Sequence, residues 1–270
     1  IYGVVGFKTH AKMMLILRRE AGEIVRYAHL GTGNYHAGNA RLYTDYSLLT
    51  SDDALCEDVG KLFSQLIGMG KTLRMKKLLH APFTLKKGML DMIARETQFA
   101  LEGKPAHIIA KFNSLTDPKI IRALYKASQS GVRIDLIVRG MCCLRPGIPG
   151  VSHNIHVRSI IGRFLEHTRV FYFLNGGEEQ MFLSSADWME RNLDKRVETC
   201  FPIEGKKLIL RVKKELECYL TDNTHSWSLQ SDGRYIRNTP TGNQTPRSAQ
   251  ATLLERLSLP VLTVSTGPSV

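Results

Sequence analysis

The sequence predicts an α/β protein made of two related modules, each with a mixed sheet flanked by helices. Strand-like and helix-like segments alternate along the chain, which is typical of α/β folds. A strand, a helix and a second strand follow one another over residues 106–139, which indicates a parallel βαβ unit. A hairpin that carries a histidine and a cation two residues apart occurs twice, at 7–34 and at 164–187. The repeat predicts two copies of one structural unit.

The first module is expected over residues 1–80. Two segments of strand-forming residues are followed by apolar positions at the spacing of one helix face, with Ser51 or Asp52 as the cap. The expected elements are strands at 7–17 and 24–30, a turn at 18–23, a glycine-rich loop at 31–34, a helix at 53–69 and a basic connector at 71–83.

The second module is expected over residues 81–228, and a loose polar tail with a short helix at 248–257 is expected over 229–270. Asp117 followed by Pro118 is a favoured helix start. The expected elements are a helix from Thr84 to Gly103, a strand at 106–112, a helix from Asp117 to Gly131, strands at 133–139, 155–160 and 164–173, a hairpin turn at 174–177, a returning strand at 180–184 and a helix at 206–221.

The composition restricts the class of protein. Of 270 residues, 43% are hydrophobic, which is enough for a core and excludes a chain that is disordered throughout. Apolar runs such as Met13–Leu17 are far shorter than the roughly 20 residues of a membrane span, so we expect no transmembrane helix. Five irregularly spaced cysteines indicate reduced thiols in a cytoplasmic protein. We expect a cytoplasmic location, with peripheral association at the inner membrane as the alternative. A net charge of +12 implies an anionic partner: nucleic acid, anionic lipid or a phosphorylated small molecule.

The two hairpins carry the residues that point to a chemistry. In each, an imidazole and a cation two residues apart on a strand project from the same face. The returning strand then ends in a loop of small and polar residues, 31–34 in one copy and 184–187 in the other, where backbone N–H groups can approach a phosphate. Two halves of one active site are the simplest account. The imidazole and cation pairs are His10 with Lys12 and His167 with Arg169.

This arrangement suits phosphoryl transfer. A neutral imidazole can attack phosphorus and form a phosphohistidine, and a second imidazole can protonate the leaving oxygen. Lys12 and Arg169 can neutralise the nonbridging oxygens. Asn34 and Ser185 are further candidate phosphate contacts. One His-x-Lys strand arises often by chance, whereas two copies with matching hairpins and loops favour a function.

Longer stretches carry a resemblance to known families. The paired motifs resemble the phospholipase D superfamily, and five segments resemble bacterial polyphosphate kinases of the histidine-intermediate type, which have phospholipase D-like C-terminal domains. The sequence departs from phospholipase D proper at Arg169, which replaces a lysine, and at Leu17 and Leu174, which replace an aspartate. Those departures fit the kinase family. The five segments are RYAHLGTGNYH (26–36), ARLYTDYSLLT (40–50), LIVRGMCCL (136–144), FLEHTRVFYF (164–173) and SSADWMERNLDKRVE (184–198).

The resemblance implies roles for individual residues. His10 matches the phosphorylated histidine, and His167 matches the second essential histidine, which also lies at the nucleotide. Tyr43 matches a tyrosine that contacts the nucleotide, and Arg139 matches an arginine near its phosphates. The residue types agree, because a tyrosine ring can stack on adenine and Arg139 ends a strand where ligands of open α/β sheets bind. Glu166 either orients the neighbouring imidazole or points the other way along the strand.

The resemblance also implies substrates and partners. The expected reaction is reversible transfer of the terminal phosphate of ATP to inorganic polyphosphate through a phosphohistidine, with ATP or ADP and polyphosphate as partners. No cluster of metal ligands is evident in the sequence, so we expect Mg²⁺ to arrive as a cofactor with ATP. We expect no specific nucleic acid and a homo-oligomer at full length. The alternatives are a phosphatidyl-transferase or phosphodiesterase of the phospholipase D type, and a non-catalytic polyanion binder.

The repeat further predicts that the first module is truncated at its N-terminus. In the second module 83 residues separate Thr84 from His167, whereas nine residues precede His10, so true copies differ by 74 residues. We therefore expect a thin first sheet with an open edge, beside a complete second sheet, and weak activity at most.

Overall fold

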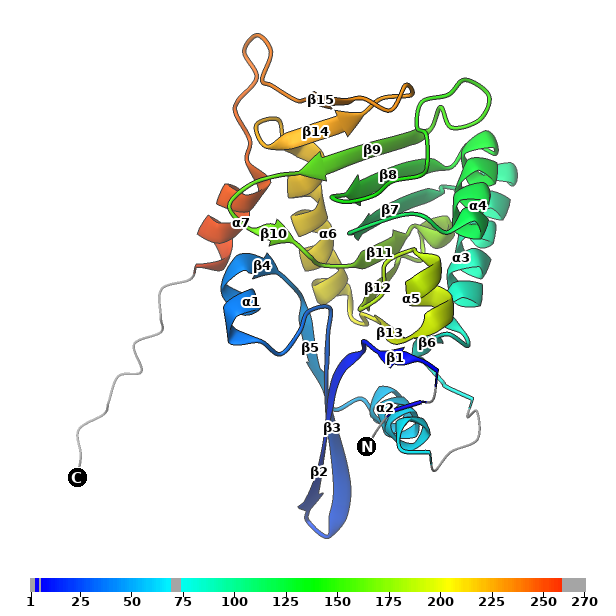
Figure 1. The fold of residues 1–270 in the computed structure, drawn as a ribbon, viewed down its shortest axis with the longest axis vertical. Coiled ribbons are helices and arrows are strands. Elements are labelled where there is room, and N and C mark those ends of the chain that lie inside the picture. Colours follow the sequence, from blue (N-terminus) through cyan, green and yellow to red (C-terminus); the bar gives the residue numbers. More distant parts are fainter. Residues whose placement is uncertain (1–2, 5, 69–73, 259–270) are drawn as a thin grey trace, which may run out of the picture.

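The computed structural model describes residues 3–4, 6–68 and 74–258. Its main feature is a mixed ten-stranded sheet (Figure 1). The strands, in order across it, are β1 (Lys8–Thr9), β13 (Arg196–Pro202), β12 (Gln180–Ser184), β11 (Val170–Phe173), β7 (His107–Phe112), β8 (Arg133–Val138), β9 (Ile155–Ile160), β14 (Ser226–Leu229) and β15 (Tyr235–Arg237), with β6 (Leu79–Ala81) paired to β13.

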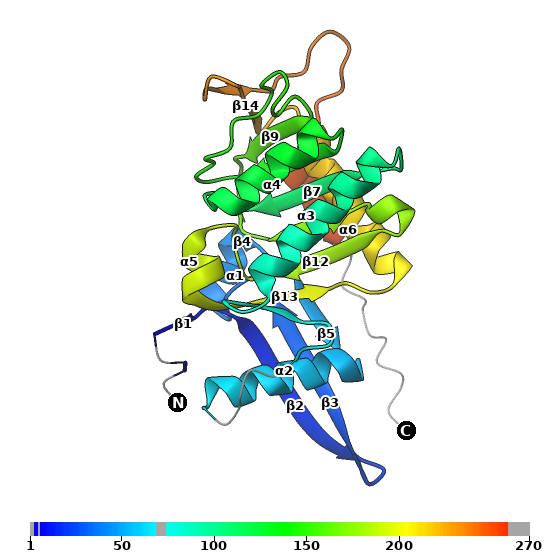
Figure 2. The same ribbon diagram turned by 90° about the vertical axis from the view of Figure 1, so that its right-hand side faces the viewer.

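Helices cover both faces of this sheet (Figures 1 and 2). On one face lie α3 (Leu85–Leu101) and α4 (Pro118–Gln129), and on the other lies α6 (Lys206–Thr221). Strands β7, β8 and β9 are parallel, so the predicted βαβ unit is confirmed. The start of α4 is also as predicted, because Asp117 accepts hydrogen bonds from the backbone N–H groups of Lys119 and Ile120.

A separate three-stranded sheet lies below the large one. Its strands are β2 (Lys12–Glu20), β3 (Glu23–Gly31) and β5 (Ser47–Thr50), and α2 (Asp53–Leu66) packs against one face (Figure 2). Asp52 caps α2 by accepting from the Leu55 amide. Between β3 and β5 lie α1 (Ala37–Leu42) and the short strand β4 (Tyr43–Thr44), which pairs with β10 (Leu165–Glu166). The expected thin first sheet beside a larger second sheet is present.

Four local predictions need correction. The strand predicted over 7–17 is divided into β1, which joins the large sheet, and β2, which joins the small one. The turn predicted at 18–23 is confined to Ala21 and Gly22, because both adopt positive φ and let the strands continue up to them. The strand predicted over 164–173 is divided into β10 and β11 by residues 167–169, which turn toward the site. The connector predicted over 71–83 contains β6, while residues 71–73 lie outside the described part of the chain.

The segment after residue 229, as far as 258, is not the loose tail that its polar composition predicts. Strand β15 extends the large sheet, and α7 (Ala249–Leu257), near the predicted helix, buries Ala249 and Leu253. Buried polar contacts hold it, because the Asp222 carboxylate accepts from the Ala249 amide and Gln250 donates to Glu166. Polar residues here pack through hydrogen bonds that add to the small apolar contact of α7.

Two predictions from composition can be compared with the structure. All five cysteines are free thiols, as their irregular spacing indicates. Within the described ranges, no helix has the length and apolar character needed to cross a membrane.

The η1 turn (Asn175–Gly177), with positive φ at all three residues, reverses the chain between the antiparallel strands β11 and β12, where the sequence predicts a hairpin.

Candidate active site

His10 is positioned by strand pairing between the two halves of the chain. β1 runs parallel to β13 with Thr9 opposite Val197, so the next residues, His10 and Glu198, lie side by side. Nδ1 of His10 is 2.8 Å from Oε2 of Glu198. The carboxylate is fully buried and accepts further hydrogen bonds from Ser185 and Asn192. Such a fixed carboxylate keeps the proton on Nδ1 and leaves the lone pair on Nε2.

His167 is positioned in the same way by the opposite pair of strands. β10 runs parallel to β4 with Glu166 opposite Thr44, which brings His167 beside Asp45. Nδ1 of His167 lies 2.9 and 3.0 Å from the two carboxylate oxygens. Burial lowers the pKa of His167, an effect that Asp45 partly offsets and that Arg169 adds to. His167 therefore rests as a neutral imidazole.

A glycine makes room for the Asp45 carboxylate. Thr32 donates a hydrogen bond of 2.7 Å to Oδ1 of Asp45, and the chain continues through Gly33. A Cβ atom on Gly33 would lie only 2.0 Å from Oδ2 of Asp45, so any other residue would displace the carboxylate from His167. The glycine-rich loop thus serves the orientation of the second histidine.

Each imidazole is therefore oriented by a carboxylate of the other module. Neither Asp45 nor Glu198 is among the site residues predicted from the sequence, although each lies in a segment that carries the family resemblance. A signal was present: Asp45 follows Asn34 by eleven residues and Glu198 follows Asp187 by eleven residues, so the repeat includes the carboxylates. The parallel pairings β1–β13 and β4–β10 explain why this spacing matters.

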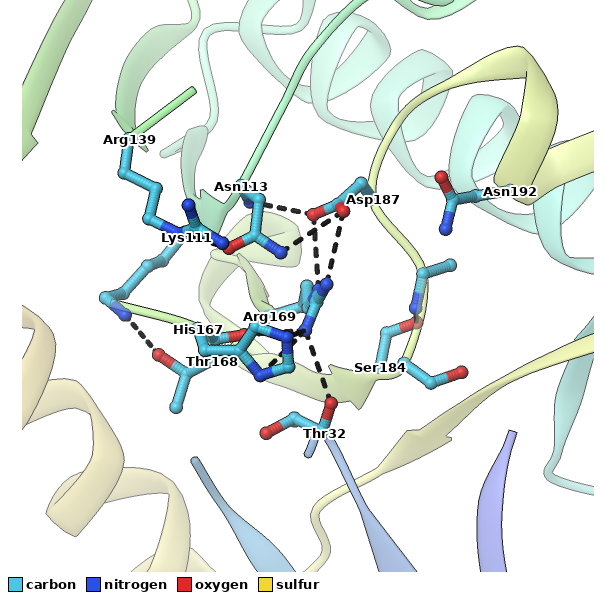
Figure 3. A network of polar contacts seen from close by, with 12 residues as sticks. Thr32, Lys111, Asn113, Arg139, His167, Thr168, Arg169, Ser184, Asp187 and Asn192 are labelled. Carbon is cyan, nitrogen blue, oxygen red and sulfur yellow. Dashed lines mark hydrogen bonds and ion pairs between the residues drawn. The ribbon is translucent and has the colours of Figure 1, made fainter. Parts of the chain in front are cut away.

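Arg169 lies at the centre of a buried polar network (Figure 3). Its guanidinium makes a forked contact with Asp187, with both N–O distances at 3.2 Å. Its Nη1 donates to the backbone carbonyls of His167, at 2.7 Å, and Thr32, at 3.3 Å. Burial alone would raise the pKa of Asp187, but Arg169 and the hydrogen bonds from Asn113 lower it below its usual value. The arginine therefore ties the second module to the loop of the first.

The network extends from Asp187 to Arg139. Asn113 donates to Asp187 through its backbone and side-chain nitrogens, and its side-chain oxygen accepts from Nε of Arg139 at 2.7 Å (Figure 3). Arg139 follows β8 at the carboxyl edge of the sheet, the position that its sequence predicts. No described residue hydrogen-bonds its two terminal nitrogens, which are free to meet an anion. The ring centroid of Tyr43 lies 5.1 Å from that of His167.

Lys12 is the cation of the first half. It is 5% exposed, and its ammonium group donates to the backbone carbonyl of His10. Burial lowers the pKa of Lys12 to about 8, an effect that Glu198 opposes and Arg169 reinforces. A bound anion would reverse part of this shift, because it would favour the charged ammonium.

Glu166 points away from His167, which decides between the two orientations that the sequence leaves open. Its buried carboxylate accepts from Lys111 at 2.8 Å, Thr44 at 2.9 Å and Gln250 at 2.6 Å. Neighbouring residues of an extended segment project to opposite sides, so one side chain faces the site and the other the core. The orienting carboxylate is Asp45.

Models of known families match nearly the whole chain. The polyphosphate kinase C-terminal domain 1 matches residues 1–72, and the polyphosphate kinase C-terminal domain 2 matches residues 78–250. The chain belongs to the polyphosphate kinase family. The resemblance that the sequence motifs carry is thereby confirmed, and so is the mixed α/β architecture.

Relatives in the family are very similar over most of this chain. It is 95% identical to a polyphosphate kinase of Pseudomonas syringae pv. tomato over 98% of its length, and 81% identical to one of Pseudomonas aeruginosa over 97%. These comparisons cover 36% and 38% of the two relatives, so the chain spans little more than a third of their length.

Solved structures agree with this assignment. A polyphosphate kinase of Porphyromonas gingivalis superposes with a TM-score of 0.90 at 39% identity, over 95% of this chain and 40% of that one. A phosphatidylserine synthase of Haemophilus influenzae superposes with a TM-score of 0.50 at 11% identity, over 86% of this chain and 66% of that one, which shows a shared fold alone.

In this member of the polyphosphate kinase family, the two weaker phosphate-contact predictions have different outcomes. Asn34 is exposed at the end of the glycine-rich loop, where it is accessible to a ligand. Ser185 is fully buried, donates its hydroxyl to Glu198 and accepts from the Thr199 amide. The Ser185 hydroxyl therefore holds the carboxylate that orients His10 and has no free donor for a phosphate.

The carboxylates at the site do not fit a resident metal ion. In the described part of the chain there is no group of three or more His, Cys, Asp or Glu residues able to hold one. Asp45 is engaged by His167 and Thr32, and Asp187 and Glu198 are engaged by the partners described above. A hard cation needs free oxygen ligands, which these residues do not offer.

Proposed function

We propose that this chain carries the two-histidine centre of an ATP:polyphosphate phosphotransferase, which moves the terminal phosphate of ATP reversibly onto inorganic polyphosphate through a phosphohistidine. The observation that carries the proposal is the pair of crossed contacts His10–Glu198 and His167–Asp45, which holds two imidazoles in one site with defined tautomers. Membership of the polyphosphate kinase family supports it.

His10 is the proposed nucleophile. With its Nδ1 proton donated to Glu198, its Nε2 lone pair attacks the γ-phosphorus of ATP, a P–N bond forms, and the P–O bond to the β-phosphate breaks with its electron pair leaving on ADP. The positive charge that develops on the ring is balanced by the buried Glu198 carboxylate. In the second half of the reaction an oxygen of the terminal phosphate of polyphosphate attacks the same phosphorus, and the N–P electron pair returns to Nε2.

His167 is the proposed acid–base partner. Its pKa is lowered and its Nδ1 faces the Asp45 carboxylate, so the neutral ring keeps its proton on Nδ1 and rests without a proton on Nε2. It therefore takes the proton of an attacking terminal phosphate monoanion in one direction and returns it in the other. The sequence predicts a general acid at this position. His167 has that role in the reverse direction, in which it returns the proton to the leaving phosphate oxygen.

The remaining residues are proposed to hold the substrates. The free terminal nitrogens of Arg139 suit a forked contact with phosphate oxygens, and Tyr43 offers a ring beside His167 for the adenine. We propose that Mg²⁺ enters bound to the phosphates of ATP, since the protein carboxylates of the described site are already engaged.

Labelling tests the proposal. With γ-labelled ATP in a single turnover, the chain should become labelled, and added polyphosphate should remove the label into longer polymer. His10→Ala should remain unlabelled, whereas His153→Ala, an exposed histidine outside the site, should label normally. A phospholipase D-type enzyme would take no label from the γ-phosphate, and a polyanion binder would take no covalent label at all. Undiminished label on His10→Ala would contradict the assignment of the nucleophile.

A further inference from the structure

A cavity of about 610 Å³ lies at the edge of the large sheet, beyond the strands that carry the two-histidine centre. Arg158 of β9, Arg237 of β15 and Arg247 in the loop before α7 line it. We call it the arginine pocket. In Figure 1 these elements lie at the upper edge of the sheet, while β1 and β13 lie at the lower edge. Its other lining residues are mainly neutral polar ones, including Thr221, Asn223, Asn238, Thr239, Gln244 and Thr245.

The positive charge of the arginine pocket is not neutralised by contact. Within the described ranges none of its three arginines forms an ion pair with a carboxylate. Asp222 is the one acidic lining residue, and its oxygens are occupied by the backbone N–H groups of Thr224, His225 and Ala249, at 2.9, 2.7 and 2.7 Å. Three cations in a concave polar surface without a partner carboxylate favour an anionic ligand.

The guanidinium groups are oriented but not saturated. Nη1 of Arg158 donates to the carbonyls of Tyr219 and Asp222 at the end of α6, at 3.1 and 3.4 Å. Nε and Nη2 of Arg237 donate to the carbonyl of Thr224, at 3.4 and 3.0 Å. The remaining N–H groups of both, and the whole guanidinium of Arg247, have no partner among the described residues. Donors that are already oriented lose little freedom when a ligand binds.

The walls of the pocket are held in place by side-chain amides. Asn223 donates to the carbonyl of Thr245 at 3.2 Å and accepts from the Arg247 amide at 2.7 Å. Asn238 donates to Ser226 at 2.8 Å. The loop that carries Arg247 is therefore pinned at both ends, so the cavity is a built feature of the fold.

We propose that the arginine pocket is a second anion site, which binds inorganic oligophosphate. Forked guanidinium donors surrounded by hydroxyl and amide groups match phosphoryl oxygens. None of the lining residues is aromatic, so the pocket has no platform on which a nucleobase can stack, which argues against nucleic acid and nucleotides. The identity of the ligand rests on the proposed function, since oligophosphate is the substrate and product class of that reaction.

A long polymer can reach both the pocket and the two-histidine centre. From β13, beside which His10 lies, to β9, which carries Arg158, there are five strand spacings, which is about 24 Å. Arg158 is in register with Ile137 and Lys111 along the sheet. The Lys111 ammonium pairs with the carboxylate of Glu166, the residue that precedes His167. The bound oligophosphate is therefore either a distal part of the polymer under synthesis or a separate molecule.

Calorimetry with inorganic tripolyphosphate tests the site in the 270-residue chain. Two classes of binding site are expected. Arg237→Gln/Arg247→Gln should weaken one class by roughly 10- to 100-fold, the loss of two charged hydrogen-bonding groups. The control Arg122→Gln/Arg234→Gln removes two exposed arginines that do not line the pocket and should change neither class. Arg139→Gln should weaken the other class alone.

Several outcomes would overturn the proposal. Unchanged binding in both the double variant and Arg247→Gln, whose side chain makes no hydrogen bond and whose loss leaves the fold intact, removes the site. If an oligonucleotide binds the wild type but not the double variant in the presence of saturating tripolyphosphate, the ligand of the pocket is nucleic acid and not oligophosphate. A labelled His10 without any binding at the pocket overturns this inference alone, whereas binding at the pocket without label removes the kinase assignment and leaves the anion site.

Long polyphosphate distinguishes the two sources of the ligand. If one polymer spans both sites, the double variant should lose far more affinity for long polyphosphate than for tripolyphosphate, because the second contact is intramolecular. If a separate molecule binds, the two affinities should fall by the same factor.

Discussion

The two halves of the chain contain the same hairpin in different surroundings. Counting from each histidine, Met13, Met14, Leu15 and Ile16 correspond to Val170, Phe171, Tyr172 and Phe173. On the face toward α2 and α6, the corresponding pairs Met13 with Val170 and Leu15 with Tyr172 join one shared core. On the other face, Met14 and Ile16 are 47% and 51% exposed, whereas Phe171 and Phe173 are fully buried beside α3 and Trp188.

This difference separates what supports the fold from what supports the chemistry. The second half has two covered sheet faces and the first half has one, yet both histidines are oriented equally well. Their orientation comes from the parallel pairings β1–β13 and β4–β10, which are local to the site. We therefore expect substitutions at the carboxylates to change catalysis, and substitutions at the corresponding apolar positions to affect stability in one half only.

The largest effect is expected at the carboxylate of the first histidine. Glu198→Gln should slow labelling of His10 by on the order of 10³ to 10⁴, because an amide donor at Nδ1 moves the imidazole proton to Nε2, the attacking atom. Asp45→Asn should slow the transfer of label from His10 to polyphosphate by on the order of 10², because His167 takes the proton of the attacking phosphate but forms no bond to phosphorus. Single-turnover labelling measures the first loss and removal of the label by added polyphosphate measures the second, with the exposed Glu190→Gln as the matched control. Equal losses in Glu198→Gln and Asp45→Asn would remove the distinction between the two histidines.

The next largest effect is on stability. Phe171 is stacked on Trp188 with ring centroids 4.8 Å apart, and Phe171→Ala should lower the free energy of unfolding by about 3–5 kcal/mol. Met14→Ala, at the corresponding exposed position, should change it by no more than about 0.5 kcal/mol. Urea unfolding measures both. A loss above 2 kcal/mol for Met14→Ala, on the scale of a buried truncation, would mean that this face is covered in solution.

A smaller effect is expected from the buried imidazole of the second half. The pKa of His167 is lowered in the folded chain, so below about 6.5 the unfolded chain binds the proton more readily. Its contribution to stability is complete above that pH and falls as pH decreases toward the folded pKa, by at most about 1.4 kcal/mol per pH unit. Urea unfolding between pH 5 and 8 should show a shallower acid loss for His167→Gln. An identical slope in the variant would contradict a depressed pKa.

The smallest effect distinguishes the two cations. The pKa of Lys12 is about 8, whereas an arginine stays charged over the accessible range. Tripolyphosphate affinity, measured in the Arg237→Gln/Arg247→Gln background, should fall by roughly two- to tenfold between pH 7 and 9. Lys12→Arg should remove that dependence. A pH profile that is the same for Lys12 and its arginine variant would show that the lysine does not meet the anion.

The sequence predicts the repeat, both histidines and their cations, because these depend on short-range spacing along a strand. It also predicts the βαβ unit and the caps of α2 and α4, which depend on neighbouring residues. The roles of Asp45 and Glu198 depend on which strand of the other half lies alongside; the repeated eleven-residue spacing marks both positions, but it does not say which histidine each carboxylate meets.

Two further differences have the same physical origin. Ser185 has the small polar character of a phosphate-binding loop, but the strand pairing directs its hydroxyl toward Glu198. The residues after 229 have a composition typical of a loose tail, but Asp222 and Gln250 attach them to the core through hydrogen bonds that only the folded chain creates. Long-range pairing thus decides what composition leaves undetermined.

The exchange of carboxylates between the halves bears on how such a site can originate. One copy of the hairpin cannot orient its own histidine, so a single ancestral copy needs a second molecule, related by a twofold axis, to build the pair. Once the two copies are joined in one chain, selection acts on each separately. Two pairs of corresponding residues are consistent with such separate selection, because the charge is the same in both copies while the side chain differs: Lys12 with Arg169, and Asp45 with Glu198.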